Sequence, residues 1–172
     1  MTDLVRSLVR DVPDFPKKGI TFKDVTPVLA NAQAFREIVD TLAERYRSRG
    51  IAKIVAIDSR GFLFGGALAY ALGAGLAIVR KPGKLPFKSV REEYALEYGM
   101  DSLEMHVDAV APGDRVLIVD DLLATGGTAE ATGRLVSGQG GEVVEYAFVI
   151  ELGFLSGRKR LGPDKVYSLI QY

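Results

Sequence analysis

The sequence predicts an α/β fold in which helices flank a parallel central sheet. Short aliphatic runs, such as residues 53–57 and 116–119, alternate with segments of helical periodicity. Runs of this kind are typical of strands buried on both faces, as in parallel sheets. Each of these two runs is followed by an acidic residue, Asp58 or Asp120. Because open parallel sheets bind ligands beyond the carboxyl ends of their strands, we expect the functional site at that edge.

Composition and length indicate one ordinary globular domain. The chain has 172 residues, of which 48% are hydrophobic and 26% charged. Basic and acidic residues both number 22, so net charge gives no indication of nucleic-acid binding. The absence of cysteine excludes disulfides and thiolate metal sites, and the single His106 cannot form a multi-histidine site. With no signal-peptide pattern and no run of about 18 apolar residues, we expect a cytoplasmic protein without a membrane span.

The N-terminal third predicts two helices separated by a proline-rich stretch. Residues 4–9 carry aliphatic side chains on one helical face, and Pro13 and Pro16 prevent that helix from continuing. Residues 20–24 then alternate like a short strand. Asn31 is a suitable N-cap for a second helix that ends near Gly50. Its expected buried stripe consists of Phe35, Ile38, Val39, Leu42 and Tyr46.

Two further strands are predicted in the middle of the chain, each followed by basic residues. Residues 53–57 lead into a turn that contains Arg60, and a helix follows over residues 63–72. An arginine fork suits phosphate oxygens or a purine edge, although a salt bridge to Asp58 explains Arg60 equally well. Residues 76–79 form the next strand and precede a basic loop at 80–86. A solvated charge run is the ordinary interpretation of that loop.

Alternating side chains predict an antiparallel hairpin after the basic loop. Apolar residues at 94, 96 and 98 alternate with Ala95 and Glu97, a turn is expected near Gly99, and alternation returns at 103, 105 and 107. Such a hairpin would project from the sheet as a lid. After it, residues 143–150 predict a last central strand, residues 152–161 an irregular helical piece, and residues 166–170 an edge strand.

Residues 116–128 predict a site for a phosphorylated sugar. A strand is expected to end at Asp120 and Asp121, and a glycine turn at Gly126 and Gly127 leads into a helix. Free N–H groups and the macrodipole at a helix N-terminus favour a phosphate, and glycines let it approach the backbone. The aspartates suit hydroxyl groups on the sugar that carries this phosphate. A Walker phosphate loop is excluded because its Gly-Lys-Ser/Thr pattern is missing.

Two stretches carry a resemblance to a known family. Residues 116–128 resemble, without a gap, the phosphoribosyl-diphosphate motif of the type I phosphoribosyltransferases. Residues 13–16, Gly19, Phe22 and residues 24–29 resemble the N-terminal signature of the adenine phosphoribosyltransferase family. The family more often has an aliphatic residue at position 21 and arginine at position 23.

The resemblance implies transfer of 5-phosphoribose from its 1-diphosphate to adenine, which yields AMP and diphosphate in purine salvage. It implies the type I fold in one domain, 1–172, with a hood at about 12–30 and a lid hairpin at about 81–108. It also implies Mg²⁺, held mainly by substrate and water rather than by protein side chains, and a homodimer with no nucleic-acid or membrane partner. The peptide bond between Asp58 and Ser59 is expected to be cis.

The resemblance also assigns roles to individual residues. Glu97 and Arg60 are the implied catalytic residues, although alternation alone makes Glu97 a solvated strand residue. The implied phosphoribosyl-binding residues are Asp120, Asp121, Ala124, Thr125, Gly126, Gly127 and Thr128. The implied diphosphate-binding residues are Ser59, Arg60, Arg80, Lys81 and Lys84, and the implied adenine-binding residues are Thr21, Phe22, Lys23 and Leu122.

Two other functions are compatible with the phosphate motif. One is a phosphoribosyltransferase for another purine base, hypoxanthine, guanine or xanthine. The other is a non-catalytic regulator that senses the donor, although such a regulator needs a nucleic-acid-binding module or a basic face. A neutral chain of 172 residues has little room for one.

Overall fold

A five-stranded parallel sheet forms the centre of the computed structural model, which describes residues 2–95 and 99–172. Its strand order is β4-β3-β7-β8-β9, and every neighbouring pair is parallel. The predicted parallel α/β fold and the edge position of the last strand are confirmed. The strands are β3 (Lys53–Ile57), β4 (Gly75–Val79), β7 (Arg115–Leu123), β8 (Glu142–Glu151) and β9 (Val166–Gln171).

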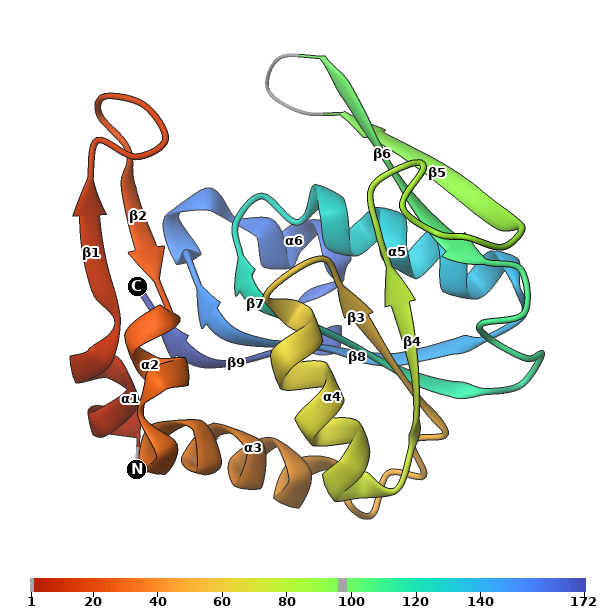
Figure 1. Ribbon diagram of the computed structural model, residues 1–172, viewed down its shortest axis with the longest axis horizontal. Coiled ribbons are helices and arrows are strands. Elements are labelled where there is room, and N and C mark those ends of the chain that lie inside the picture. The colour runs from red at the N-terminus through yellow and green to blue at the C-terminus, as the bar shows by residue number, and fades with distance from the viewer. Residues whose placement is uncertain (1, 96–98) are drawn as a thin grey trace.

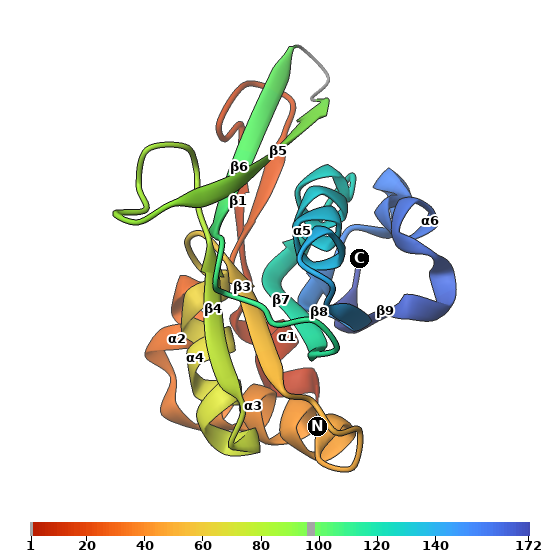
Figure 2. The same cartoon turned by 90° about the vertical axis from the view of Figure 1, so that its right-hand side faces the viewer.

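Helices cover both faces of this sheet (Figures 1 and 2). One face carries α1 (Thr2–Leu8), α2 (Thr26–Ala30), α3 (Ala32–Tyr46) and α4 (Gly61–Leu72), and their apolar side chains form one buried cluster with it. The other face packs against α5 (Gly127–Gly138) and the lid strands in a second cluster. Within the described ranges, no helix is both long and apolar enough to cross a membrane.

The N-cap expected at Asn31 is confirmed. Its side-chain oxygen accepts a hydrogen bond from the backbone N–H of Ala34 at 3.0 Å, which satisfies one of the free donors at the start of α3. Ile38, Leu42 and Tyr46 of the predicted stripe are buried. Packing of this stripe fixes α3 beneath the sheet.

Two antiparallel hairpins rise from the same end of the sheet (Figure 1). In the first, β1 (Arg10–Pro13) pairs with β2 (Thr21–Asp24), and in the second, β5 (Ser89–Ala95) pairs with β6 (Met100–His106). Only β2 of the first hairpin is predicted by sequence, because Pro13 argues against a strand. The alternating pattern in the sequence indicates β5 only from Tyr94 onwards. The first half of this strand is not predicted, because its residues are mostly charged or polar. Glu97 lies outside the described residues.

The expectation that a strand ends at Asp120 and Asp121 is wrong. Strand β7 continues through both aspartates to Leu123, because β8 is long enough to pair with it up to Glu151. The chain after β8 is irregular, as predicted: η1 (Gly153–Leu155), α6 (Gly157–Leu161) and η2 (Pro163–Lys165) lead to β9. The aspartates are therefore held on a rigid strand rather than on a loop.

Candidate active site

The chain leaves the neighbouring strands β3 and β7 at the same end, where sheets of this kind bind ligands. Here the first turn of α4 touches the end of β7. A Cβ atom on Gly61 would lie 2.9 Å from both the Asp120 Oδ1 atom and the Val119 carbonyl oxygen. Glycine at position 61 thus lets the turn that carries Ser59 and Arg60 lie directly beside Asp120.

A small cavity of about 90 Å³ opens where β7 meets α5. Gly126, the N-cap of α5, has φ 84°, a left-handed conformation that favours glycine. The helix begins at Gly127, so its first N–H groups lie at the cavity and are suited to an anion. The cavity is lined by Asp120, Leu122, Leu123, Ala124, Thr125, Gly126, Gly127, Thr128, Ala129 and Phe148.

A larger hollow of about 550 Å³ lies along the outer face of α3, lined by residues such as Gln33, Arg36 and Glu44. None of the residues that line it is a predicted site residue. The start of α3 beside it is capped by the side chain of Asn31, whereas α5 has no side-chain cap. We therefore place the candidate site at the smaller cavity.

Arg60 connects the turn after β3 with the phosphate motif and with the hairpin of β1 and β2. Its Nε atom donates a hydrogen bond to the carboxylate of buried Asp121, and its Cζ atom lies 5.3 Å from the centre of the Phe22 ring. Phe15 meets Phe22 edge to face with ring centres 5.3 Å apart. The salt bridge between Arg60 and Asp58 that sequence left open is not formed; the partner of Arg60 is Asp121.

Asp58 instead pairs with the basic loop. The Arg80 Nε atom donates to Asp58 Oδ2 at 3.0 Å, and the Lys84 Nζ atom lies 3.9 Å from the same oxygen. The peptide bond between Asp58 and Ser59 is cis, as expected. Ser59 is exposed at this turn.

Lys81 of the same loop reaches the second hairpin. Its ammonium group donates a hydrogen bond to the Asp101 carboxylate and another to the Tyr94 hydroxyl, the latter at 2.8 Å. Tyr94 and Asp101 are direct partners across β5 and β6. The basic loop is therefore tied to the lid hairpin rather than extended into solvent.

The pKa values at the site reflect burial and close charges. Burial and the neighbouring Asp121 charge raise the pKa of the Asp120 carboxyl well above its ordinary range. Partial burial lowers the pKa of Arg60, but the hydrogen bond to Asp121 and the nearby carboxylate charges together raise it by more, so the pKa of the guanidinium lies above its ordinary value. Burial also lowers the pKa of Lys81, but its interactions with Asp101 and Tyr94 outweigh this effect, so the net pKa is raised.

The predicted adenine-binding residues are brought together only in part. Phe22 lies beside Arg60, and Leu122 lines the cavity. Thr21 is exposed, and the Lys23 ammonium group lies 2.6 Å from an Asp11 carboxylate oxygen and 4.0 Å from the Tyr172 ring centre. The side chain of Lys23 is thus engaged elsewhere, which leaves its main chain for any contact with a base.

Sequence reasoning assigned no role to Asp58, Tyr94 or Asp101. The sequence offers Asp58 as the residue after a strand, as a possible salt-bridge partner of Arg60 and as part of the expected cis peptide bond, but not as the partner of Arg80 and Lys84. The hairpin register sets Tyr94 directly opposite Asp101, whereas a turn centred on Gly99 would set Tyr94 opposite Glu104, so the expected turn position does not bring Asp101 to Tyr94. Among residues 2–95 and 99–172, no group of three or more His, Cys, Asp or Glu side chains is arranged to hold a metal ion.

This fold and this site define the class of the protein. The phosphoribosyl transferase domain family matches residues 24–170, so the chain belongs to that family. Its relatives show which members of that family it is similar to. The chain is 61% identical to the adenine phosphoribosyltransferase of an Anaeromyxobacter species over 99% of this chain and 96% of the relative.

Solved structures give the same result. The crystal structure of adenine phosphoribosyltransferase from Thermoanaerobacter pseudethanolicus superposes with a TM-score of 0.97 at 52% identity, with full coverage of both chains at 100%. That of the Saccharomyces cerevisiae enzyme, complexed with adenine and an imino-altritol bisphosphate, gives a TM-score of 0.92 at 41% identity over 98% of each chain. The similarity therefore extends over the entire fold.

Proposed function

We propose that this protein transfers 5-phosphoribose from 5-phospho-α-D-ribose 1-diphosphate to adenine, giving AMP and diphosphate in purine salvage. The observation that carries this proposal is the cavity in which Asp120 of β7 meets the N-terminus of α5. It combines a phosphate cradle with a carboxylate suited to sugar hydroxyls. The names of the relatives support adenine as the acceptor.

The donor's phosphoribosyl half occupies that cavity. Backbone N–H groups of residues 124–128 bind the 5′-phosphate, and the side chain of Thr128, at the start of α5, adds a hydroxyl donor. Asp120 and Asp121 accept hydrogen bonds from the ribose hydroxyls.

The diphosphate half faces the turn and the basic loop. Ser59, Arg60, Arg80, Lys81 and Lys84 bind it in this proposal, and three of the cations already contact carboxylates across the site. When diphosphate binds, it replaces those carboxylates as the anionic partner of the cations. Positive charge fixed in advance around the leaving group stabilises the negative charge that develops on it.

Adenine binds between Phe22 and Leu122, and the main chain of residues 21–23 reads its edge. The contact between Phe22 and Arg60 supports this position, because it brings the hood to the diphosphate side of the site. Main-chain groups present the same donors and acceptors whatever the side chains at positions 21 and 23. Both departures from the family pattern are then tolerated.

Mg²⁺ is the proposed cofactor, and the chemistry of the site fits it. Mg²⁺ prefers hard oxygen ligands, and the Asp120 carboxylate at the cavity would accept hydrogen bonds from its bound water. No protein cage for a metal occurs among the described residues, so substrate oxygens and water would supply its ligands. When bound, the ion neutralises charge on the diphosphate.

The reaction breaks the donor's C1–O bond and forms a bond between C1 and a ring nitrogen of adenine. The electron pair leaves with diphosphate, positive charge grows on the ribose ring, and adenine loses its ring proton. Arg60 stabilises the leaving group, and Glu97 accepts the proton or directs it to water; this assignment of Glu97 rests on the family resemblance. Alignment of the two reacting atoms supplies a large part of the acceleration.

We further propose one domain over residues 1–172, with the hood at 12–30 and the lid hairpin at 81–108. The protein acts as a cytoplasmic homodimer, a location with which the lack of cysteine agrees. Light scattering at assay concentration tests the dimer. A fully active monomer would contradict it and would require Lys81 and Lys84 to act within one chain.

The test of the function is an assay with the donor, Mg²⁺ and each purine in turn. Adenine should yield AMP, and hypoxanthine should react about 10⁴-fold less efficiently, because buried hydrogen bonds that match an amino group reject an oxo group. Comparable turnover of hypoxanthine and adenine would falsify the proposed specificity. Binding of the donor without turnover of any purine would favour the donor-sensing regulator.

A further inference from the structure

The segment that follows β8 lies directly against the phosphate loop. A Cβ atom on Gly157, the first residue of α6, would lie 2.2 Å from the Ala124 carbonyl oxygen. A Cβ atom on Gly126 would lie 2.8 Å from the Gly157 carbonyl oxygen. Such distances are far inside van der Waals contact, so only glycines allow these two backbones to approach. The position of α6 thus limits the position of residues 124–126.

The segment formed by Ser156 and α6 is not stable by itself. Helix α6 spans five residues, and helices so short are unstable without tertiary contacts. Ser156, which precedes it, has φ 55°, a left-handed conformation that few non-glycine residues adopt. Side-chain contacts to the rest of the fold must therefore keep α6 in place.

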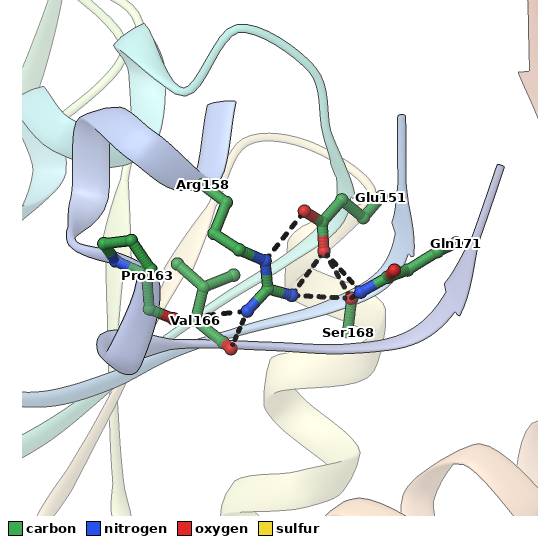
Figure 3. A network of polar contacts seen from close by, with 6 residues as sticks. All are labelled: Glu151, Arg158, Pro163, Val166, Ser168 and Gln171. Carbon is green, nitrogen blue, oxygen red and sulfur yellow. Dashed lines mark hydrogen bonds and ion pairs between the residues drawn. The ribbon is translucent and has the colours of Figure 1, made fainter. Parts of the chain in front are cut away.

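Arg158 provides these contacts (Figure 3). Its Nε and Nη2 atoms donate to the two carboxylate oxygens of Glu151 at 2.9 and 2.5 Å, and its Nη1 atom donates to the Val166 carbonyl oxygen at 2.7 Å. Ser168 and Gln171 donate to the same carboxylate at 2.5 and 3.2 Å. The guanidinium therefore ties α6 to the end of β8 and to β9 at once.

Loss of Arg158 would leave a buried charge without its main partner. The side chain of Glu151 is 6% exposed, and its hydrogen bonds from Arg158 lower its pKa. A paired, two-pronged arginine–carboxylate contact is strong and directional. Without it, the carboxylate would attract water and α6 would lose its fixed position.

We propose that Arg158 and Gly157 are positioning residues for the 5′-phosphate of the donor. Arg158 holds α6 in place, and Gly157 lets α6 support the phosphate loop from behind. The inference rests on the proposed function. Because the 5′-phosphate does not react, its contacts stabilise bound substrate and transition state equally, so a displaced loop raises KM for the donor and leaves kcat nearly unchanged.

The test compares Arg158→Met and Gly157→Ala with Arg45→Met. Arg45 is a matched control, because its Nε and Nη2 atoms bind the equally buried Glu145 at 2.9 Å, near the opposite end of β8. We expect KM for the donor to rise at least tenfold in the first two variants, with kcat within threefold and KM for adenine within twofold of the parent. Arg45→Met should lose thermal stability while its donor KM stays within twofold. Arg158→Lys should recover part of the donor affinity.

Calorimetric titration with ribose 5-phosphate separates this inference from the proposed function. Binding of ribose 5-phosphate should weaken at least tenfold in Gly157→Ala. Because this variant retains the ion pair between Arg158 and Glu151, it tests the inference even if Arg158→Met does not fold. A parent that binds ribose 5-phosphate but makes no AMP would contradict the function alone. Unchanged ribose 5-phosphate binding and donor KM in Gly157→Ala, or an equal loss in Arg45→Met, would overturn the inference.

Discussion

Each cation proposed to bind the diphosphate already faces a carboxylate. Arg60 contacts Asp121, Arg80 and Lys84 share Asp58, and Lys81 contacts Asp101. At the scale of single residues, donor binding is therefore an exchange of anions rather than the capture of an anion by free cations. Such an exchange lowers the net gain from each contact and raises the selectivity for a ligand that meets all of them together.

A single carboxylate is predicted to handle the proton of adenine. Glu97→Gln should lower kcat at least tenfold, because a positioned base typically contributes about 10²–10⁴-fold, while KM for adenine changes less than twofold. Steady-state rates with adenine varied at saturating donor measure both constants. The control is Glu93→Gln on β5, an exposed glutamate whose carboxylate lies 3.8 Å from the guanidinium of Arg91. A kcat for Glu97→Gln within twofold of the parent would return Glu97 to the role of a solvated residue.

Among the elements, the hairpin of β1 and β2 contributes an aromatic ring to the site. Phe22→Leu keeps an apolar side chain but removes the ring that we propose stacks on the purine. Aromatic stacking is worth about 0.5–1.5 kcal/mol beyond burial, so KM for adenine should rise three- to tenfold while KM for the donor stays constant. The measurement is initial rates with each substrate varied. Phe87→Leu, at an exposed ring that packs on His106, serves as the control and should change neither KM; an equal effect of both changes would remove Phe22 from the base site.

The lid hairpin holds the ammonium group of Lys81 through hydrogen bonds to Asp101 and Tyr94. Asp101→Asn removes the negative partner of Lys81, so less interaction is lost when Lys81 turns to the diphosphate. We expect KM for the donor to fall two- to fivefold, with a steeper rise of this KM as salt is added. Asp108→Asn, at an exposed aspartate that follows β6, is the control. A donor KM that rises in Asp101→Asn would indicate that the aspartate positions Lys81 for binding.

At the scale of the whole molecule, two buried glutamates at opposite ends of β8 make stability depend on pH. Hydrogen bonds from Arg158 lower the pKa of Glu151 below its ordinary 4.5. Burial opposes ionisation of Glu145, but hydrogen bonds from Arg45, Tyr46 and Arg49 give a lowered pKa there too. Below pH 4.5 these two side chains bind more protons in the unfolded chain than in the folded one, so their contribution to stability rises with pH in that window.

Thermal unfolding between pH 7 and pH 3 tests this dependence. The melting temperature should fall steadily below pH 4.5 as the pH drops through the lowered pKa values of Glu151 and Glu145. Glu145→Gln should have a lower melting temperature at pH 7 and a shallower fall below pH 4.5, because one linked proton is removed. An unchanged acid slope in that variant would assign the pH dependence to other carboxylates.

Sequence determined the order of the elements and the chemistry of the loop. Buried aliphatic runs specify β3, β7 and β8 locally, and Asn31 begins its helix with its own side chain. The glycine pair at 126 and 127 specifies the turn before α5, because its left-handed residue requires no Cβ. These features depend on neighbours in the chain, and this is why periodicity and turn residues predict them.

Tertiary structure alone decided which charges meet. Arg60 pairs with Asp121 rather than with Asp58, its neighbour in sequence, because β3 and β7 are adjacent and Gly61 lets the turn lie against β7. Likewise β7 continues past its aspartates only because β8 is there to pair with it. Spacing along the chain does not encode such contacts. They arise from strand order and from the close approach of backbones, which exist only once the sheet has assembled.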